Sequence, residues 1–428
     1  MKRIHIFFII STICAVVLTA ALLIVFIPRS KKTHENSNEI NNTISSTTDG
    51  VTSTTKIITV QTIQNSTTKF GNSTATSTQR TTSNSAQSLY WTMDASLNTK
   101  RYWFGAALLA NGNVIVSGGW LNSSIVTRST EFYSSSTGWI FGPSMNATQY
   151  DHTLTAFANN TKVLSAGGRS NNGLKLAEVY DSINNIWRST FNNMISESYL
   201  RKSTLLGNEQ ILFTGGFNAS GISVKVAELY DAASNSFIKI NDMITTRVHH
   251  TSTLLSDKST VLVTGGINAS NYLIYTAELY NAGSWMVLNN SMTINRAYHA
   301  AVLLNDGNVL IAGGSNGGDY SFSNAEIYNV TARTFKAVGS MKYRRDRFSL
   351  TLLPSGNVLA VGGMDWTNKT IINVCELYDP VTQTWSDTKI LNTRRYIHQT
   401  VLLNDSVLVI GGYDGNGNGI ATSEKYYF

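Results

Sequence analysis

Arginine and glutamate recur at similar spacing from residue 101 onward, and these charged residues are the first candidates for chemistry. The recurring residues are Arg101, Arg201, Arg247, Arg296, Arg345 and Arg395, with Glu131, Glu178, Glu228, Glu278, Glu326, Glu376 and Glu424. A ring of exposed guanidinium groups would attract an acidic ligand. Because arginines and glutamates recur in nearly equal number, ion pairs within each repeat are the preferred interpretation. Lys342, Arg344 and Arg347 are left over, and we interpret them as a solvated basic loop.

Asp414-x-Asn416-x-Asn418-Gly419 offers oxygen ligands of the kind that calcium prefers, and it resembles the first half of an EF-hand loop. That motif requires a bidentate acid where this chain has Lys425. Glu424 lies one residue early and already belongs to the recurring set. Elsewhere the sequence shows no nucleophile–base motif, phosphate-binding loop or metal-binding cluster. We therefore predict no catalytic residue, no metal and no cofactor.

A repeat in the sequence indicates which elements would position these side chains. Seven Gly-Gly doublets end short apolar runs, and they begin at residues 118, 167, 215, 265, 313, 362 and 411. Each doublet is followed by a Glu-x-Tyr sequence and, in most repeats, by an aromatic residue and then a Met. A period near 50 residues with several short β-rich segments is typical of a propeller.

Four strands fit into one repeat. In the repeat opened by Arg296, Asp306-Gly307 supplies the φ > 0 positions of a tight hairpin. Strand a follows the arginine, b precedes the Gly-Gly, c contains Glu-x-Tyr and d contains the next aromatic residue. The last repeat has no d strand, whereas Trp91 has the register of one. We therefore predict an all-β, seven-bladed propeller over residues 89–428, closed by strand 89–93.

The N-terminal residues 1–32 have a different character. Residues 4–27 are almost wholly apolar with basic residues on both sides, and this length suits a bilayer span. We predict a transmembrane signal-anchor, with the rest of the chain extracellular or luminal, or secreted if the segment is cleaved. Asn-x-Ser/Thr sites that all follow the span favour this orientation. These candidate glycosylation sites are Asn41, Asn65, Asn72, Asn122, Asn146, Asn159, Asn218, Asn268, Asn289, Asn329, Asn368 and Asn404.

Residues 33–88 contain 26 Ser or Thr among 56 and almost no aromatic residues. Such a composition cannot bury enough apolar surface to fold, so we predict a disordered stalk. The net charge of +7 belongs mostly to the anchor, since five of the 33 basic residues flank the span and leave 28 against 26 acidic ones. This balance and the lack of a basic stripe predict no nucleic-acid partner. Cys375 is the only cysteine after the span, which excludes a disulfide within the propeller.

The Gly-Gly doublet, the tyrosine of strand c, the aromatic residue of strand d and an Arg-x-x-His before strand a together resemble kelch repeats. Arg-x-x-His is intact at Arg247, Arg296 and Arg395, and the third repeat reads Arg201-Lys-Ser-Thr204. The resemblance, to the kelch domain of galactose oxidase and to bacterial-type kelch proteins, covers residues 89–428. It implies a fold but no single activity, because the family includes adaptors, cytoskeletal binders and oxidases.

Tyr298-His299, Tyr396-x-His398 and Tyr150-x-His152 resemble the place where galactose oxidases hold copper. A copper radical site of that family also needs further Tyr and His ligands, a Tyr–Cys cross-link and flanking domains. Here Tyr and His recur in several blades, and Cys375 falls on a c strand, away from the axis. Packing within the repeat is therefore the preferred interpretation, with a galactose-oxidase-like copper ectoenzyme as the alternative.

A propeller of the kelch type carries its b–c and d–a loops on one face, around the axis. The residue after each Gly-Gly varies sharply, as Trp120, Arg169, Phe217, Ile267, Ser315, Met364 and Tyr413. Aromatic residues and arginine are common recognition anchors. Several of these loops contain sequons, and the more open sector is predicted in blades 5 to 7.

The predicted site in that sector takes an acidic or carbohydrate ligand and consists of Tyr320, Arg345, Arg347, Trp366 and Tyr413. Asn368 lies two residues from Trp366, so a glycan there would cover part of the sector. The sequence thus predicts a membrane-tethered extracellular propeller that binds a protein or glycan ligand without catalysis.

Overall fold

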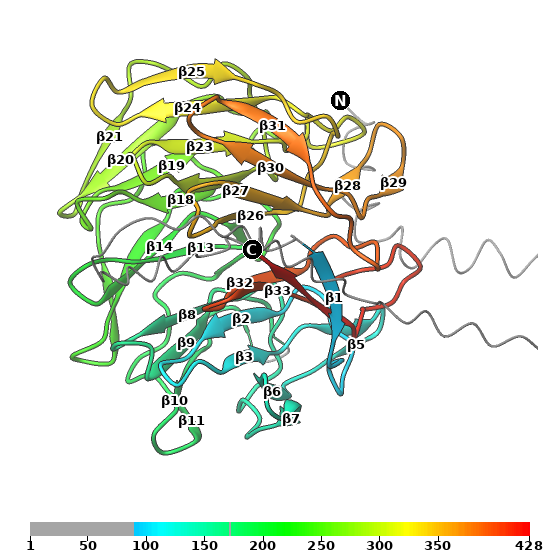
Figure 1. Cartoon of the computed structure of the whole chain (residues 1–428). Helices are drawn as coiled ribbons and strands as arrows, with labels where there is room; N and C mark the ends of the chain where they lie inside the picture. The colour runs from blue at the N-terminus through cyan, green and yellow to red at the C-terminus, as the bar shows by residue number, and fades with distance from the viewer. Residues whose placement is uncertain (1–89, 171–172) are drawn as a thin grey trace, which may run out of the picture. The chain divides into compact units, whose positions relative to one another are not determined.

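The computed structural model describes residues 90–170 and 173–428. Seven antiparallel sheets of four strands are arranged around one axis in these residues (Figure 1), which confirms the all-β, seven-bladed propeller. No helix of the described residues is long and apolar enough to cross a membrane. The predicted anchor 1–32 and stalk 33–88 lie outside the described residues. We number the blades 1 to 7 in chain order.

The two inner strands of each blade are a and b. The a strands are β2 (Gly105–Leu108), β8 (Thr153–Phe157), β13 (Lys202–Leu205), β18 (Thr251–Leu254), β22 (Ala300–Leu303), β26 (Ser349–Leu352) and β32 (Gln399–Leu402). The b strands are β3 (Val114–Ser117), β9 (Lys162–Ala166), β14 (Gln210–Thr214), β19 (Val261–Thr264), β23 (Val309–Ala312), β27 (Val358–Val361) and β33 (Ser406–Ile410). Each a strand contacts the a strands of both neighbouring blades, so the ring is closed.

The outer strands c and d complete each sheet. The c strands are β6 (Thr130–Ser134), β10 (Ala177–Asp181), β16 (Ala227–Asp231), β20 (Ala277–Asn281), β24 (Ala325–Asn329), β30 (Cys375–Asp379) and β34 (Ser423–Tyr427). The d strands are β7 (Gly138–Phe141), β11 (Ile186–Ser189), β17 (Ser236–Lys239), β21 (Ser284–Val287), β25 (Thr334–Val338), β31 (Thr384–Asp387) and β1 (Tyr90–Asp94). Short strands in the loops pair as β4 (Trp120–Asn122) with β5 (Ile125–Val126), β12 (Ser198–Tyr199) with β15 (Phe217–Asn218), and β28 (Met364–Asp365) with β29 (Thr370–Ile371).

Strand β1 is the d strand of blade 7, although it precedes blade 1 in the chain. It pairs antiparallel with β34, and Trp91 lies opposite Tyr426 with 5.1 Å between ring centroids. The indole N–H of Trp91 donates to the carbonyl oxygen of Lys389 at 2.8 Å. The last sheet is therefore assembled from both ends of the described chain.

The Gly-Gly doublets connect neighbouring blades. Gly313 and Gly314 have φ of 63° and 93°, and a Cβ on either would lie 2.6 Å from a backbone oxygen. The N–H of Gly314 donates to the carbonyl of Arg345 in the next blade at 2.9 Å. Blade 7 makes the same bond to blade 1, from Gly412 to Arg101 at 3.0 Å. Only glycine fits here, because the next blade occupies the space of a side chain at Gly313 and the backbone of Ala297 in the same blade occupies it at Gly314.

A buried Met or Leu follows each d strand and packs between blades. These residues are Leu97, Met145, Met194, Met243, Met292, Met341 and Leu391, each at most 4% exposed. Met341, for example, belongs to a cluster that joins Ile327 of blade 5 to Val358 of blade 6. The hydrophobic core is therefore a series of layers between adjacent sheets.

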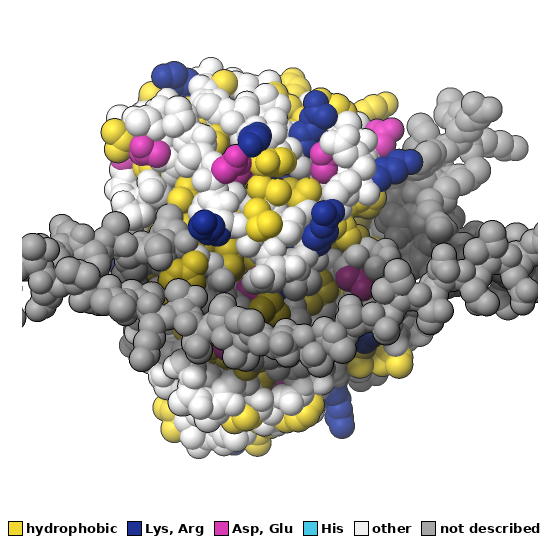
Figure 2. Space-filling model, turned by 45° about the vertical axis from the view of Figure 1, so that its right-hand side comes forward, with side chains coloured by type: hydrophobic (Ala, Val, Ile, Leu, Met, Phe, Trp, Pro, Cys, Tyr) yellow, Lys and Arg dark blue, Asp and Glu magenta, His cyan; other side chains and the backbone are white. Residues whose placement is uncertain are grey.

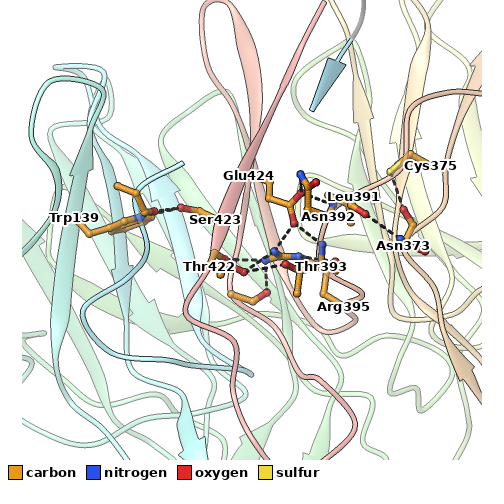
Figure 3. A network of polar contacts seen from close by, with 12 residues as sticks. Trp139, Asn373, Cys375, Leu391, Asn392, Thr393, Arg395, Thr422, Ser423 and Glu424 are labelled. Carbon is orange, nitrogen blue, oxygen red and sulfur yellow. Dashed lines mark hydrogen bonds and ion pairs between the residues drawn. The ribbon is translucent and has the colours of Figure 1, made fainter. Parts of the chain in front are cut away.

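The recurring arginines form buried ion pairs with glutamates of the same blade, as predicted. In blade 7, Arg395 Nη2 lies 2.8 Å from Glu424 Oε1 with neither side chain exposed (Figure 3). The guanidinium also donates to the carbonyl of Gly411, and Glu424 accepts the backbone N–H of Thr393. The other pairs are Arg101–Glu131, Arg201–Glu228, Arg247–Glu278, Arg296–Glu326 and Arg345–Glu376. We call these six pairs the ion-pair layer.

Blade 3 departs from the predicted register by three residues. Ser198 stands at the arginine position, four residues after Met194, and Arg201 takes the position that histidine has in other blades. A Cβ on Gly167 would meet Arg201 at 3.2 Å, where the first glycine of most other doublets faces a histidine or phenylalanine. The prediction that Arg201 opens an Arg-x-x-His equivalent is therefore wrong. Its guanidinium reaches Glu228 from the histidine side.

Blade 2 has a glutamate without an arginine. Gln149 stands at the arginine position, and its side-chain oxygen accepts a hydrogen bond from Ser165 at 2.9 Å. Glu178 accepts the backbone N–H groups of Asn146 and Ala147 at 2.7 and 3.0 Å. Burial raises the pKa of Glu178, and these hydrogen bonds only partly oppose that effect.

Candidate binding site at the propeller axis

In each blade, the residue two positions before the first residue of strand a has a left-handed backbone although it is not glycine. These residues are Trp103, Asp151, Leu200, His249, Tyr298, Arg347 and Ile397, with φ between 48° and 56°. We call them the axial ring. The left-handed conformation costs a residue with a side chain about 1–2 kcal/mol. Such strain often accompanies a functional site.

Backbone hydrogen bonds join members of the axial ring across blade boundaries. The bonds run from the N–H of Asp151 to Trp103, of Tyr298 to His249, of Arg347 to Tyr298 and of Ile397 to Arg347, at 3.0 to 3.2 Å. Backbones paired in this way lie about 5 Å apart, so seven of them enclose a ring ~11 Å across. This width lies between backbones, and side chains of the ring such as His249 and Tyr298 occupy part of it.

Two further residues of each blade flank the ring, one just before the ring residue and one just after the Gly-Gly. They are bridged in antiparallel fashion as Tyr102–Trp120, Tyr150–Arg169, Tyr199–Phe217, Val248–Ile267, Ala297–Ser315, Asp346–Met364 and Tyr396–Tyr413. We call these residues the rim. Aromatic residues dominate it in blades 7, 1, 2 and 3, whereas buried aliphatic or small residues occupy it in blades 4 and 5.

Rim side chains of blades 7, 1 and 2 form a chain of aromatic contacts. Tyr396 and Tyr413 have ring centroids 5.4 Å apart, and Tyr413 lies 4.9 Å from Tyr102. Tyr102 lies 6.5 Å from Trp120, which meets Tyr150 edge-on at 4.9 Å. These are the spacings of favourable aromatic pairs.

Blades 2 and 3 continue the contacts through a cation. The Arg169 guanidinium lies 5.9 Å from the centre of the Tyr150 ring and 3.7 Å from that of Tyr199. Tyr199 contacts Phe217 at 5.6 Å, and Phe217 meets His249 edge-on at 5.5 Å. The guanidinium is therefore held between two tyrosine rings.

Blades 4 to 6 contribute a second cation. His249 stacks on Tyr298 at 3.8 Å, and the Arg347 guanidinium lies 3.7 Å from the centre of the Tyr298 ring. Arg347 also lies 5.4 Å from the Trp366 ring and pairs with Asp346 at 3.0 Å. Both Asp346 carboxylate oxygens accept the indole N–H of Trp366 at 3.0 Å. We call the whole series, from Tyr396 round to Trp366, the aromatic circuit.

Polar atoms without partners gather on the blade 1 and 2 side of this circuit. Trp120 Nε1, Asp151 Oδ1 and Arg169 Nε are buried and have no hydrogen bond within the described residues. Burial raises the pKa of Asp151 to about 7, although the nearby charge of Arg169 opposes the shift. Buried donors and acceptors cost free energy until a ligand or water satisfies them. A ligand could satisfy these atoms only by displacing the side chains that cover them.

The structure separates the five residues predicted to bind a ligand. Arg347 and Trp366 lie together in the aromatic circuit, and Tyr413 lies in its blade 7 part. Tyr320 is 40% exposed on the loop between β23 and β24. Arg345 is fully buried within the ion-pair layer, so it does not reach this surface.

The prediction left out most of the circuit because it restricted the site to the loops of blades 5 to 7. A usable signal is present in the sequence, since the rim and ring residues lie five and six positions after the buried Met or Leu. Counting from Met194 gives Tyr199 and Leu200, and counting from Met243 gives Val248 and His249. This count also corrects the register of blade 3.

The histidines of the Tyr298-His299 and Tyr396-x-His398 pairs bond to hydroxyl groups. His299 and His398 lie below the ring, where their Nε2 atoms bond to the hydroxyls of Thr251 and Ser349 at 3.0 and 3.1 Å. Within the described residues no three or more His, Cys, Asp and Glu side chains are grouped to hold a metal. Cys375 is buried on β30, and burial raises its thiol pKa to about 12.

The Asp414 loop uses its carboxylate for its own backbone. Asp414 Oδ1 accepts the N–H groups of Asn416 and Asn418 at 2.7 and 3.3 Å. Asn218 and Asn268 accept backbone N–H groups in the same way in the equivalent loops of blades 3 and 4. A repeated turn therefore explains the motif that resembles a calcium loop.

None of the candidate glycosylation asparagines in the propeller is buried. Asn146, Asn159, Asn289, Asn368 and Asn404 are exposed. The side-chain amide of Asn368 donates to Asp365 at 2.8 Å. A glycan on this nitrogen would have to replace that bond, and glycosylation itself stays a prediction.

The face drawn in Figure 2 is mixed in charge. Lys and Arg side chains lie apart from one another, with Asp and Glu among them and a patch of hydrophobic side chains between them. A nucleic-acid site would instead need a continuous basic stripe.

Two comparisons with known proteins concern the propeller. A family model described as the kelch motif matches residues 355–390, which include strands β27 to β31 of blade 6. A solved structure of a fungal alcohol oxidase of the AA5 family, in complex with copper, is similar with a TM-score of 0.64. The two chains are 19% identical, and the match covers 79% of this chain and 76% of that one. At this identity the likeness shows the fold alone.

Proposed function

We propose that this seven-bladed propeller, which carries a kelch motif, is a non-catalytic binding module for a carbohydrate ligand at its axis. The observation that carries the proposal is the aromatic circuit together with the unpaired polar atoms beside it. Repeated scaffold contacts do not explain this circuit, because its residues differ from blade to blade. The proposed site includes Trp366, Arg347 and Tyr413 of the predicted set and extends it to blades 1 to 4.

The chemistry of the circuit favours a sugar. A sugar ring has an apolar C–H face that fits an aromatic ring, and Tyr and Trp offer such faces at low conformational cost. Its hydroxyl groups would satisfy the unpartnered indole N–H of Trp120 and the unpartnered Oδ1 of Asp151 once the side chains that cover these atoms move.

Glycan binding by the purified protein tests the proposal. A glycan array finds the ligand, and titration then compares wild type with Trp120→Ala and Tyr150→Ala. Each substitution should weaken binding about 30-fold or more, as expected for an aromatic anchor. Phe191→Ala is the matched control, because Phe191 is 86% exposed outside the circuit. Equal affinity in all four proteins would refute the site.

The cellular setting is part of the proposal. A chain anchored by residues 4–27 would hold the propeller outside the cell, where glycans are abundant. Surface labelling of intact cells should tag the propeller, and glycosidase treatment should increase its gel mobility. A propeller that resists surface protease and shows no glycosidase shift would contradict an extracellular location.

A second candidate function is oxidation of an alcohol at a copper site, as named for the fungal alcohol oxidase whose fold is similar. His249 and Tyr298 are the candidate donors in the axial ring, and they stack face to face at 3.8 Å. Copper analysis of the purified protein separates the two functions. Stoichiometric copper, together with oxygen-dependent alcohol oxidation, would replace the binding role by the oxidase.

A further inference from the structure

The seven innermost strands contain a single charged residue. Their other residues are Gly, Ala, Ser, Thr, Gln, Val, Leu and Phe, and the exception is Lys202 at the start of β13. Lys202 follows Leu200 of the axial ring by two residues, which is about 7 Å along an extended strand. Its flexible four-carbon side chain can therefore bring the ammonium group close to the level of the ring.

Lys202 has no acid beside it to balance its charge. Within the described residues it makes no ion pair and no side-chain hydrogen bond, whereas the preceding residue Arg201 is paired with Glu228. Its side chain is exposed, yet the surrounding protein lowers its pKa by desolvation. An ammonium group that is exposed but partly desolvated fits a position beside the axis, where the surrounding strands leave room for little water.

The titratable groups near Lys202 are imidazoles. Burial is the largest cause that lowers the pKa of His249, His250 and His299, and the charge of Lys202 adds to it in each case. The imidazoles therefore stay neutral at pH 7. His250 and His299 already bond to threonine hydroxyls through Nε2. Arg347 adds positive charge to the same surroundings, and its partner Asp346 lies on the rim.

We propose that Lys202 binds the anionic group of an acidic sugar, while the rest of that sugar stacks on the aromatic circuit above it. This inference rests on the carbohydrate-binding function proposed above and narrows its ligand to sugars that carry a carboxylate or a sulfate. An unbalanced ammonium beside the axis gains a counter-ion when such a ligand enters. The small, uncharged residues of the other innermost strands leave Lys202 as the anchor for the charge.

The test uses a uronic-acid oligosaccharide and its carboxyl-reduced form, which differ only in charge. Wild type should bind the acidic sugar at least 10-fold more tightly than the reduced one, and added salt should reduce this preference. Lys202→Met keeps the apolar stem and should bind both sugars equally, with the affinity of wild type for the reduced sugar. A sulfated oligosaccharide with its desulfated form shows which anion is preferred.

Two control variants keep the outcomes distinct. Lys239→Met removes an exposed lysine from the outer strand β17 and should leave the preference intact. Tyr150→Ala should weaken the acidic and the reduced sugar alike. If Lys202→Met retains the wild-type preference while Tyr150→Ala loses binding, the inference fails and the binding function stands. If wild type binds none of these sugars, both fail. Equal melting temperatures of the variants establish that each one folds.

Discussion

The ion-pair layer and the axial ring are neighbouring regions of the propeller that differ in what they repeat from blade to blade. The layer uses the same two residue types in almost every blade, fully buried and in the same contacts. The ring repeats one backbone conformation, but its side chains are Trp, Asp, Leu, His, Tyr, Arg and Ile. Repetition of a side chain therefore marks scaffold, whereas repetition of backbone alone leaves the side chains free for another use.

The cost of the ring residues strengthens this contrast. Left-handed positions favour glycine or asparagine, and a β-branched residue such as Ile397 is among the least suited. Backbone strain alone would favour glycine at these positions. The side chains are present all the same, and in several blades they contact the aromatic circuit. Recognition at the axis gives a reason for them.

The contrast depends on a closed ring, and removing the closing strand should have the largest effect. Replacing residues 90–94 by Gly and Ser removes the pairing of β1 with β34 and the packing of Trp91. We expect a loss of at least about 3–5 kcal/mol in the free energy of unfolding. Denaturant unfolding of the full chain measures it, with Met93→Ala, at a 50% exposed position, as the control. Equal midpoints would show that β1 does not close the ring.

The ion-pair layer should respond nearly as strongly to the loss of one partner. Arg296→Met leaves the carboxylate of Glu326 buried without its cation, and we expect a loss of about 3–5 kcal/mol in the free energy of unfolding. Arg188→Met, on the exposed edge strand β11, should change it by less than ~0.5 kcal/mol. A small effect of Arg296→Met would remove the distinction between layer and surface.

Asp151 of the axial ring should make the free energy of unfolding depend on pH. Its folded-state pKa is about 7 and its ordinary value is 3.8, because burial disfavours the charged form. As pH rises from about 4 to 7 the unfolded carboxyl ionises first, so the free energy of unfolding falls over this window and then stays level. Asp151→Asn should lack that fall. The difference in free energy of unfolding between Asp151→Asn and wild type should therefore shift in favour of the variant by on the order of 1–3 kcal/mol between pH 4 and pH 8. Parallel pH profiles of the two proteins would contradict the raised pKa.

The smallest effect on stability is expected within the ring itself. Ile397→Gly relieves left-handed strain but makes the unfolded chain more flexible, and the two terms nearly cancel. We expect the free energy of unfolding to change by less than about 1 kcal/mol, as measured by thermal and denaturant unfolding. Ala107→Gly in β2, where a buried residue has an ordinary strand backbone, is the comparison and should lose about 1 kcal/mol. A larger loss of stability in Ile397→Gly would show that the side chains of the ring serve the scaffold.

The sequence determined the fold because each blade of a propeller repeats the same pattern of residues at a regular spacing. Glycine is required wherever another segment of backbone leaves no room for a side chain, as at Gly313 and Gly314. A buried charge requires its partner, as for Arg296 and Glu326. Such local demands recur with every blade, so they can be counted along the sequence. The same reasoning predicted the ion pairs within the blades.

The candidate site could be predicted only in part. Arg347, Trp366 and Tyr413 are variable positions near predicted loops, and the structure places all three in the aromatic circuit. Arg345 has the same residue type as Arg347 two positions away, yet it is fully buried in an ion pair. Residue type alone does not distinguish them, since the backbone of the d–a loop sets which side chain turns to the axis.

The tertiary structure alone decided which residues of different blades meet. His249 stacks on Tyr298, and Arg169 lies between Tyr150 and Tyr199, across blade boundaries that no local pattern crosses. It also placed Lys202 as the one charge on the innermost strands, through a register shift in blade 3. Contacts within a blade follow from spacing along the chain, whereas contacts around the axis depend on how seven sheets close into a ring.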